Sequence, residues 1–233
     1  METYSEPRFE PSTVESDRVL AWTWLMGKPR RRGFVIACLS TMILLLGTLW
    51  IWSLPAGMAE TFSANRVAIF HDREWWRLWT ALFAHSDLGH ILSNAGLFFV
   101  FGLLLSGYFG LFLFPTMALA FGGLTNLLVV GTSSPEMHLI GMSGVVYWMG
   151  GVWLTLYFLL SRHLSLTQRT LRSFGVALMI FMPGEAFNPS ISYKAHAVGF
   201  CLGVIFAFFY FMVHRSSFRA AERYTVLPRE EDL

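Results

Sequence analysis

The sequence predicts an all-α, polytopic membrane protein with a bundle of six transmembrane helices. Hydrophobic residues make up 55% of the 233 residues, charged residues make up only 14%, and the mean hydropathy is +0.52. This composition is too apolar for a typical soluble domain. No charged residue lies between Asp87 and Glu136, or between Glu136 and Arg162. Clusters of arginine also recur at alternate ends of the apolar segments, as the positive-inside rule requires.

The chain begins with a polar segment, residues 1–33, which ends in the basic run 28–32. A secretory signal peptide places its apolar core closer to the start and follows it with a small-residue cleavage site, so we expect the first span to be retained. The membrane domain is predicted over residues 34–214, with its first span from Phe34 to Ser53. Residues 215–233 are predicted to form a cytoplasmic tail.

The next region combines an interfacial connection with two spans. Residues Leu54 to Ala84 are amphipathic and include the aromatic-basic string 74–79, which suits the boundary between membrane and water. The apolar stretch from Leu88 to Val130 is too long for one span. We expect a tight turn at Ser106-Gly107-Tyr108 and Gly110 to divide it into spans two and three.

Three further spans complete the bundle. Span four is predicted from Ser143 to Leu160, span five from Leu171 to Met182 and span six from Ala195 to Val213. A helix needs roughly 20 residues to cross a ~30 Å hydrocarbon core. The fifth span is therefore short, and either it begins earlier, near Leu166, or the bilayer thins around it.

The basic clusters predict the orientation of the bundle. They precede span one, separate spans four and five, and follow span six, so both termini are expected in the cytoplasm. The starts of spans four and six then face the outer side. These two starts carry Ser143 and His196, which places a hydroxyl and an imidazole at the same side of the membrane.

Ser143 lies in the string Gly141-Met142-Ser143-Gly144 at the start of span four. A serine in this position is often only a helix N-cap. The neighbouring glycines, however, allow another backbone or a substrate to approach closely. The N–H groups of the first helical turn also have no intrahelical partner and point toward negative charge beside the hydroxyl. The position can therefore supply a nucleophile and part of an oxyanion hole.

His196 lies near the start of span six. On its own it fits a hydrogen-bonded packing histidine. Ala195, Gly199 and Gly203 form a stripe of small residues that lets this helix pack closely against another. Close packing is what a serine and its general base require, because they must come within hydrogen-bond distance.

His90 and Asn94 are four residues apart and share one face of span two. They could simply join helices by hydrogen bonds, or both could donate to an oxyanion. His85 falls on a different side, where we expect it to brace the boundary loop. A zinc site of His85, Asp87 and His90 is conceivable, but no H-E-x-x-H motif or third ligand at helical spacing supports it, and no metal is predicted.

These motifs together resemble the rhomboid family of intramembrane serine proteases, over roughly Arg73 to Met212. The residues that carry the resemblance are Trp76-Arg77, His85, His90, Asn94, the segment Gly141-Met142-Ser143-Gly144-Val145-Val146-Tyr147, and the segment Ala195-His196-Ala197-Val198-Gly199-Phe200-Cys201-Leu202-Gly203. Several linked motifs in the same order make the resemblance specific.

The resemblance implies a serine endopeptidase with a Ser143/His196 dyad. It implies an oxyanion hole made by the Ser143 N–H, His90 and Asn94. It also implies that Tyr147 packs on His196. The supporting glycines of the site are Gly141, Gly144 and Gly199. Trp76-Arg77 would hold the first outer loop in the membrane.

The same resemblance implies partners and a location. Transmembrane proteins are the expected substrates, in contact with the lipid bilayer, and neither a cofactor nor a nucleic acid is expected. We expect an integral protein of a bacterial inner (plasma) membrane with its active site toward the outer side. A movable gate is predicted at Phe181 to Phe187, which contains Pro183-Gly184. The oligomeric state is left open.

The sequence departs from the family pattern at two positions, and two other function classes stay open. Ser106 occupies a position where the family often has glutamate, so a stabilising contact is expected to be weaker or rebuilt. Trp148 replaces a residue that is often small. A non-catalytic relative that binds transmembrane segments for quality control or trafficking remains an alternative. A transporter or channel is a third class, which the lack of an acidic pair within the spans disfavours.

Overall fold

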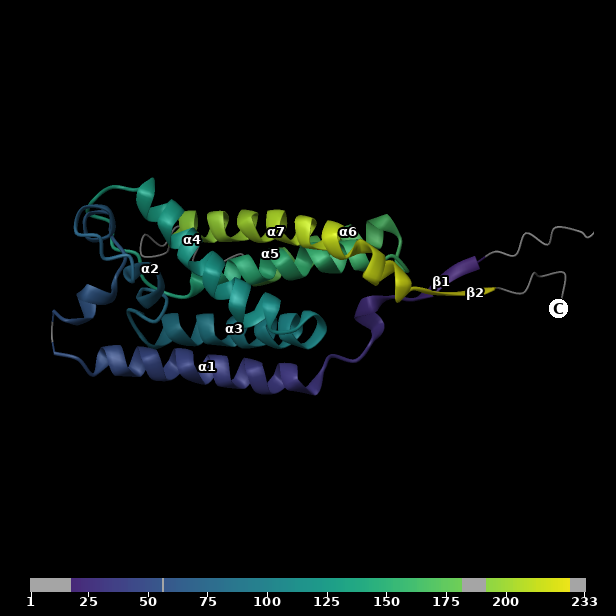
Figure 1. The fold of residues 1–233 in the computed structure, drawn as a ribbon, viewed down its shortest axis with the longest axis horizontal. Helices are drawn as coiled ribbons and strands as arrows, with labels where there is room; N and C mark the ends of the chain where they lie inside the picture. The colour runs from purple at the N-terminus through teal and green to yellow at the C-terminus, as the bar shows by residue number, and fades with distance from the viewer. Residues whose placement is uncertain (1–17, 56, 182–191, 227–233) are drawn as a thin grey trace, which may run out of the picture.

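The structure is a computed structural model, and it describes residues 18–55, 57–181 and 192–226. Its longest helices run lengthwise beside one another (Figure 1). The elements are, in chain order, β1 (Arg18–Trp22), η1 (Trp24–Met26), α1 (Arg31–Trp52), η2 (Ala59–Phe62), η3 (Val67–His71), α2 (Arg77–Thr80), α3 (Leu88–Phe109), η4 (Phe112–Met117), α4 (Ala118–Gly131), α5 (Ser143–Leu160), α6 (Leu166–Phe181), α7 (Tyr193–Ala220) and β2 (Arg223–Val226).

Within the described ranges, five helical segments are long and apolar enough to cross a membrane. They are α1, α3, Phe112–Gly131, α5 and α7. Helix α6, which corresponds to the predicted fifth span, has 16 residues and begins at Leu166. The chain is therefore a helical membrane protein with five candidate spans, and the sixth crossing stays a prediction.

The structure agrees with the predicted bounds of α5 but places the end of α3 later than predicted. Helix α5 begins at Ser143 and ends at Leu160, as the sequence predicts. The predicted turn at Ser106-Gly107-Tyr108 and Gly110 is confirmed only at Gly110, because α3 continues through Ser106, Gly107 and Tyr108 to Phe109. The Ser106 hydroxyl donates to the carbonyls of Gly33 (3.1 Å) and Gly102 (2.5 Å), so it is satisfied within the helix packing. The chain turns only at Gly110, whose φ of +86° favours glycine.

Helix α5 is the centre of the bundle. It packs against α3, α4, α6 and α7. Trp148 on α5 is fully buried, and its ring centroid lies 5.1 Å from that of Phe121 and 5.3 Å from that of Phe206. The large side chain is therefore accommodated by aromatic neighbours on α4 and α7 rather than excluded from the core.

At two glycines of α7, the contact between α5 and α7 brings backbone against backbone. A Cβ atom added to Gly199 would overlap the carbonyl oxygen of Gly144, and one added to Gly203 would overlap that of Trp148. The predicted stripe of small residues on α7 therefore faces α5. Such stripes allow close approach of helices in membranes, where lipid is as apolar as the side chains.

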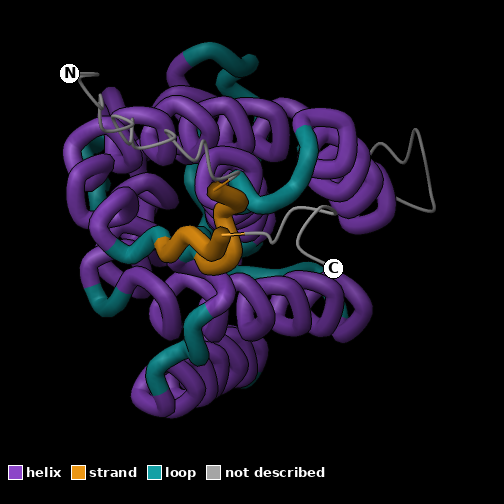
Figure 2. Tube along the Cα trace, turned by 90° about the vertical axis from the view of Figure 1, so that its right-hand side faces the viewer, coloured by secondary structure: helices purple, strands orange, loops and turns teal. Residues whose placement is uncertain are grey.

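The segments that flank the first and last long helices pair with each other, although the sequence indicated only solvated ends. Strands β1 and β2 form an antiparallel sheet at one end of the bundle (Figure 2). Trp24, just after β1, packs edge-on against Phe218 of α7 with ring centroids 5.2 Å apart. Its indole N–H donates to the carbonyl of Tyr108 at 3.3 Å. Glu222 accepts bonds from Arg162 and Arg219, which fixes the end of α7.

Candidate functional site

Ser143 is the first residue of α5 and is half-buried. The preceding loop reaches it through Gly141, whose φ of +100° is a left-handed conformation. The N–H of Gly141 donates to the carbonyl of Ala81 at 2.8 Å, which ties this loop to the segment after α2. The N–H groups that open a helix lack intrahelical acceptors, so the start of α5 is a natural place to bind a developing anion.

The predicted oxyanion residues lie against this loop. A Cβ atom at Gly141 would lie 2.8 Å from Nε2 of His90 and 3.8 Å from Nδ2 of Asn94. A side chain larger than glycine at this point would displace the His90 ring, whereas the distance to Asn94 is an ordinary contact. The Asn94 amide donates to the carbonyl of His90 at 3.1 Å, a bond that uses one of its two N–H groups. The structure therefore brings His90 and Asn94 together beside the residues that lead into Ser143.

His196 lies in the first turn of α7, and its ring stacks on Tyr147. The ring centroids are 3.9 Å apart and the planes differ by 12°. This is the packing that the resemblance implies. Tyr147 lies one turn after Ser143 on α5, and the nearby Gly144–Gly199 contact joins the same ends of the two helices. These contacts are consistent with a Ser143/His196 pair, and the pair itself stays a prediction.

His85 braces two segments around the site. The Thr48 hydroxyl of α1 donates to the carbonyl of Phe83 at 2.8 Å, so it accepts from Nδ1–H of His85 at 3.1 Å. The other ring nitrogen, Nε2, accepts a long bond of 3.4 Å from the N–H of Met142. These partners fit a neutral ring with its proton on Nδ1. Burial, together with the neighbouring charge of His90, lowers the pKa of His85 to about 4.

The sequence predicted that His85 braces the boundary loop, but not that it holds Met142 and α1. The one available signal was Thr48, a polar residue inside an otherwise apolar span. Thr48 is buried, and a buried hydroxyl in a membrane helix needs a hydrogen-bond partner. That partner could not be identified from spacing alone, because Thr48 and His85 are far apart in the chain.

Arg77 stabilises the first outer loop, as the resemblance implies for Trp76-Arg77. Its side chain pairs with Glu74 and donates to the carbonyls of Glu60 and Ser63, each at 3.2 Å. The neighbouring Trp76 is exposed and so is available to contact lipid. Among the described residues, no group of three His, Cys, Asp or Glu side chains is arranged to hold a metal ion.

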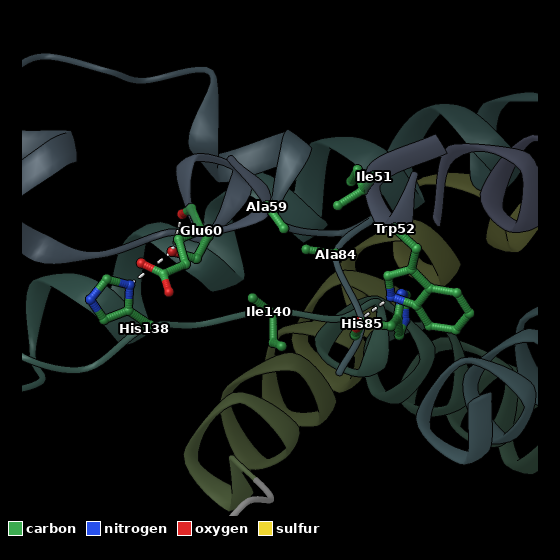
Figure 3. A pocket seen from close by; sticks show the side chains of 9 residues that line it. Ile51, Trp52, Ala59, Glu60, Ala84, His85, His138 and Ile140 are labelled. Carbon is green, nitrogen blue, oxygen red and sulfur yellow. Dashed lines mark hydrogen bonds between the residues drawn. The ribbon is translucent and has the colours of Figure 1, made fainter. Parts of the chain in front are cut away.

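Two cavities lie near these residues. One, of about 360 Å³, has the His196 ring in its wall, and its other lining residues are Tyr147, Ala177, Leu178, Tyr193, Ala197 and Phe200. It opens between α5, α6 and α7. The other, of about 390 Å³, has His85 and Trp52 on one side and Glu60 and His138 on the other (Figure 3). The second cavity borders the residue that braces Met142, whereas the first contains the predicted base.

The predicted gate, Phe181 to Phe187, lies outside the described residues except for the helical backbone of Phe181. The described part of α6 ends beside the cavity that contains His196, since Ala177 and Leu178 contribute to its wall.

Comparison with known proteins identifies the family. A family model described as "Rhomboid domain" matches residues 72–213. The chain is also 29% identical over 180 residues to a Bacillus subtilis (strain 168) protein named "Putative rhomboid protease YdcA", which covers 72% of this chain and 86% of that protein. The matched region contains the loop at Gly141, the start of α5 and the α5–α7 contact. The chain belongs to the rhomboid family.

Proposed function

We propose that this protein is an intramembrane serine endopeptidase that hydrolyses a peptide bond in or near a transmembrane segment of a substrate protein. Membership of the rhomboid family and the relative named as a rhomboid protease support a protease. The observation that carries the serine mechanism is the stacking of Tyr147 on His196, one helical turn from Ser143. This contact supports a hydroxyl and an imidazole at the same end of the α5–α7 pair.

The proposed reaction is acyl transfer in two steps. Nε2 or Nδ1 of His196 takes the proton of Ser143, and the hydroxyl oxygen attacks the scissile carbonyl. The oxyanion accepts hydrogen bonds from the Ser143 N–H, from Nε2 of His90 and from Nδ2 of Asn94. His196 then protonates the leaving amine. A water molecule, activated by the same imidazole, attacks the acyl-enzyme and releases the acid.

The substrate segment is proposed to approach along α6. The cavity between α5, α6 and α7 has His196 in its wall and is lined mainly by apolar and aromatic side chains. An extended peptide with small residues fits such a site better than an intact helix, because its carbonyl groups are free. In the proposed orientation α6 completes six crossings, both termini lie in the cytoplasm, and the site faces the outer side.

The test is the substitution Ser143→Ala in the full-length protein in liposomes. Wild-type protein should cleave a model transmembrane substrate and react with a fluorophosphonate probe, and Ser143→Ala should do neither while remaining inserted and folded. Ser93→Ala is the matched control, because the exposed Ser93 hydroxyl only donates to the carbonyl of His90 on its own helix. Cleavage by Ser143→Ala at the wild-type rate would overturn the proposal. Absence of both cleavage and labelling in the wild type would favour the non-catalytic alternative.

A further inference from the structure

A chain of hydrogen bonds at the start of α3 ends on the ring of His90. Asp87 is the N-cap residue of α3, and its Oδ1 accepts the backbone N–H of His90 at 2.9 Å. Its Oδ2 accepts the Ser86 hydroxyl at 2.7 Å. The same hydroxyl oxygen lies 3.2 Å from Nδ1 of His90. Ser86 therefore sits between a carboxylate and an imidazole.

The number of protons decides the direction of these bonds. Ser86 has one hydroxyl proton, and the ionised carboxylate of Asp87 can only accept. The bond from the Ser86 hydroxyl, followed by that from the His90 N–H, lowers the pKa of Asp87. Asp87 is exposed and therefore ionised at neutral pH. Because the Ser86 hydroxyl donates its one proton to Asp87, the Ser86 oxygen can only accept from His90, so Nδ1 of His90 must carry a proton and donate it.

Because Nδ1 of His90 donates to Ser86, the protonation of the other ring nitrogen, Nε2, depends on the charge of the ring. Neutral imidazole has a single N–H, so a proton on Nδ1 leaves Nε2 as a bare acceptor. Nε2 is the atom that lies against Gly141, on the approach to Ser143. A lone pair there would repel an oxyanion rather than stabilise it. Nε2 can donate only if the ring carries both protons.

We propose that His90 acts on the oxyanion as an imidazolium, with Asp87 supplying the counter-charge through Ser86. This inference rests on the proposed function, because it assumes an oxyanion beside Ser143. Asp87 and Ser86 are positioning residues, since they act through His90 and do not touch the substrate. The proposal adds two residues to the site that the motifs did not include.

Two other titratable groups lie around His90. They are His85 from the preceding loop, with ring centroids 4.9 Å apart, and His196 from α7. His85 stays neutral, because its low pKa of about 4 follows from its burial. His196 must be neutral to accept the Ser143 proton. When the proton has moved, the charges alternate in sign along Asp87, His90, the oxyanion and His196, which is the most favourable order.

The test is the pH dependence of kcat in the full-length protein in liposomes. Asp87→Asn removes the charge but keeps a good N-cap residue, and Ser86→Ala removes the connection. An opposite charge nearby favours the charged form by about one pH unit or more. Without the charge of Asp87, the His90 imidazolium should lose its proton at a lower pH. Both variants should therefore move the alkaline limb of the profile about one unit lower, with about a tenfold loss of kcat on that limb. The acid limb, which reports His196, should not move.

A spectroscopic measurement complements the kinetics. In ring-¹⁵N-histidine protein inhibited by a fluorophosphonate, both nitrogens of His90 should be protonated in the wild type, and only one in Asp87→Asn at the same neutral pH. Ser93→Ala should match the wild type in both measurements, because Ser93 does not contact the His90 ring.

Two results would overturn the inference and leave the proposed function intact. One is an Asp87→Asn profile that superimposes on the wild type while Ser143→Ala is inactive. The other is a gain of activity in Asp87→Asn, which would mean that the Ser86 hydroxyl donates to Nδ1 and that neutral His90 is the donor. Failure of the proposed function itself would appear separately, as cleavage that survives Ser143→Ala.

Discussion

The two helices that carry the predicted dyad have very different surroundings. In α5, 61% of the residues of its 18-residue apolar stretch are buried inside the protein, whereas in the corresponding stretch of α7 only 22% are buried. Helix α5 is surrounded by four other helices, while α7 exposes large residues such as Phe208, Phe209 and Val213. Ser143 is therefore positioned from several sides. His196 is positioned by its stacking on Tyr147, by the glycine contact of α7 with α5, and by Lys194, which donates to the Thr132 carbonyl at 2.5 Å.

The largest effect is expected from breaking the contact that holds α7. In Gly199→Ala the new methyl group would overlap the Gly144 carbonyl oxygen, a backbone atom that cannot rotate away. The helices must separate, at a cost of about 1–3 kcal/mol of stability. A displacement of His196 by about 1 Å should lower kcat about 100-fold. Cleavage assays and thermal unfolding in detergent would measure the two effects.

Gly96→Ala is the matched control for this substitution. Gly96 is also in a helix, but a Cβ atom there would have no neighbour within 4 Å. Replacing a helical glycine without a clash should leave stability unchanged or raise it by about 0.4–1 kcal/mol. If Gly199→Ala behaved like Gly96→Ala, the close contact would not be what positions His196.

A smaller effect is expected from weakening the support on the α5 side. His85→Phe keeps a ring of similar size but leaves the Met142 N–H without its acceptor, while the Thr48 hydroxyl keeps only its bond to the Phe83 carbonyl. A buried unsatisfied group costs about 1–3 kcal/mol. Because other contacts still hold α5, we expect kcat to fall less than in Gly199→Ala. Equilibrium unfolding in mixed micelles would give the loss of stability.

We expect His85→Phe also to change how the stability of the fold depends on pH. The pKa of His85 is about 4 in the folded protein, below the ordinary value of 6.5. The unfolded chain therefore binds more protons between these values, and stability is lost as the pH falls from about 6.5 toward 4. The full effect is about 3 kcal/mol. His85→Phe should lose less stability than the wild type between about pH 7 and pH 5. Equal slopes would show that His85 is not held neutral by the fold.

The smallest effect is expected at Ser106. Its hydroxyl joins α3 to α1 through the Gly33 carbonyl, at the end of α3 opposite to His90. Hydrogen bonds between membrane helices contribute about 0.6 kcal/mol on average. Ser106→Ala should lower stability by about this amount and change kcat less than twofold. A large loss of activity would show that the α1–α3 contact is coupled to the site.

The predictable parts of this molecule are those that follow from local chemistry. Helix α5 begins at Ser143 because a glycine with positive φ ends the loop and a long uncharged run follows. The small-residue stripe on α7 predicted a close helix contact, and Gly199 and Gly203 do make one. In contrast, α3 does not end at Ser106 as expected; the Ser106 hydroxyl bonds to the Gly102 carbonyl of its own helix and also reaches the Gly33 carbonyl on α1. The Gly33 carbonyl is distant in the chain and leaves no local signal.

The least predictable parts depend on long-range pairing. The bond from the Met142 N–H to His85 joins two residues 57 positions apart in the chain, and no motif indicates it. The sheet of β1 and β2 is a further case, since its two short strands are separated by nearly the whole chain. Each strand is marginal alone and forms because the bundle brings its partner near.

That sheet has a consequence for how the protein responds to its ends. Strand β1 precedes η1 and α1, and β2 follows α7, so the main-chain hydrogen bonds between the two strands close the polypeptide into a loop. Tension or bulk applied to one terminus is transmitted to the opposite terminus as well. An affinity tag fused at either extremity therefore loads the first and the last long helix together, including the helix that carries His196.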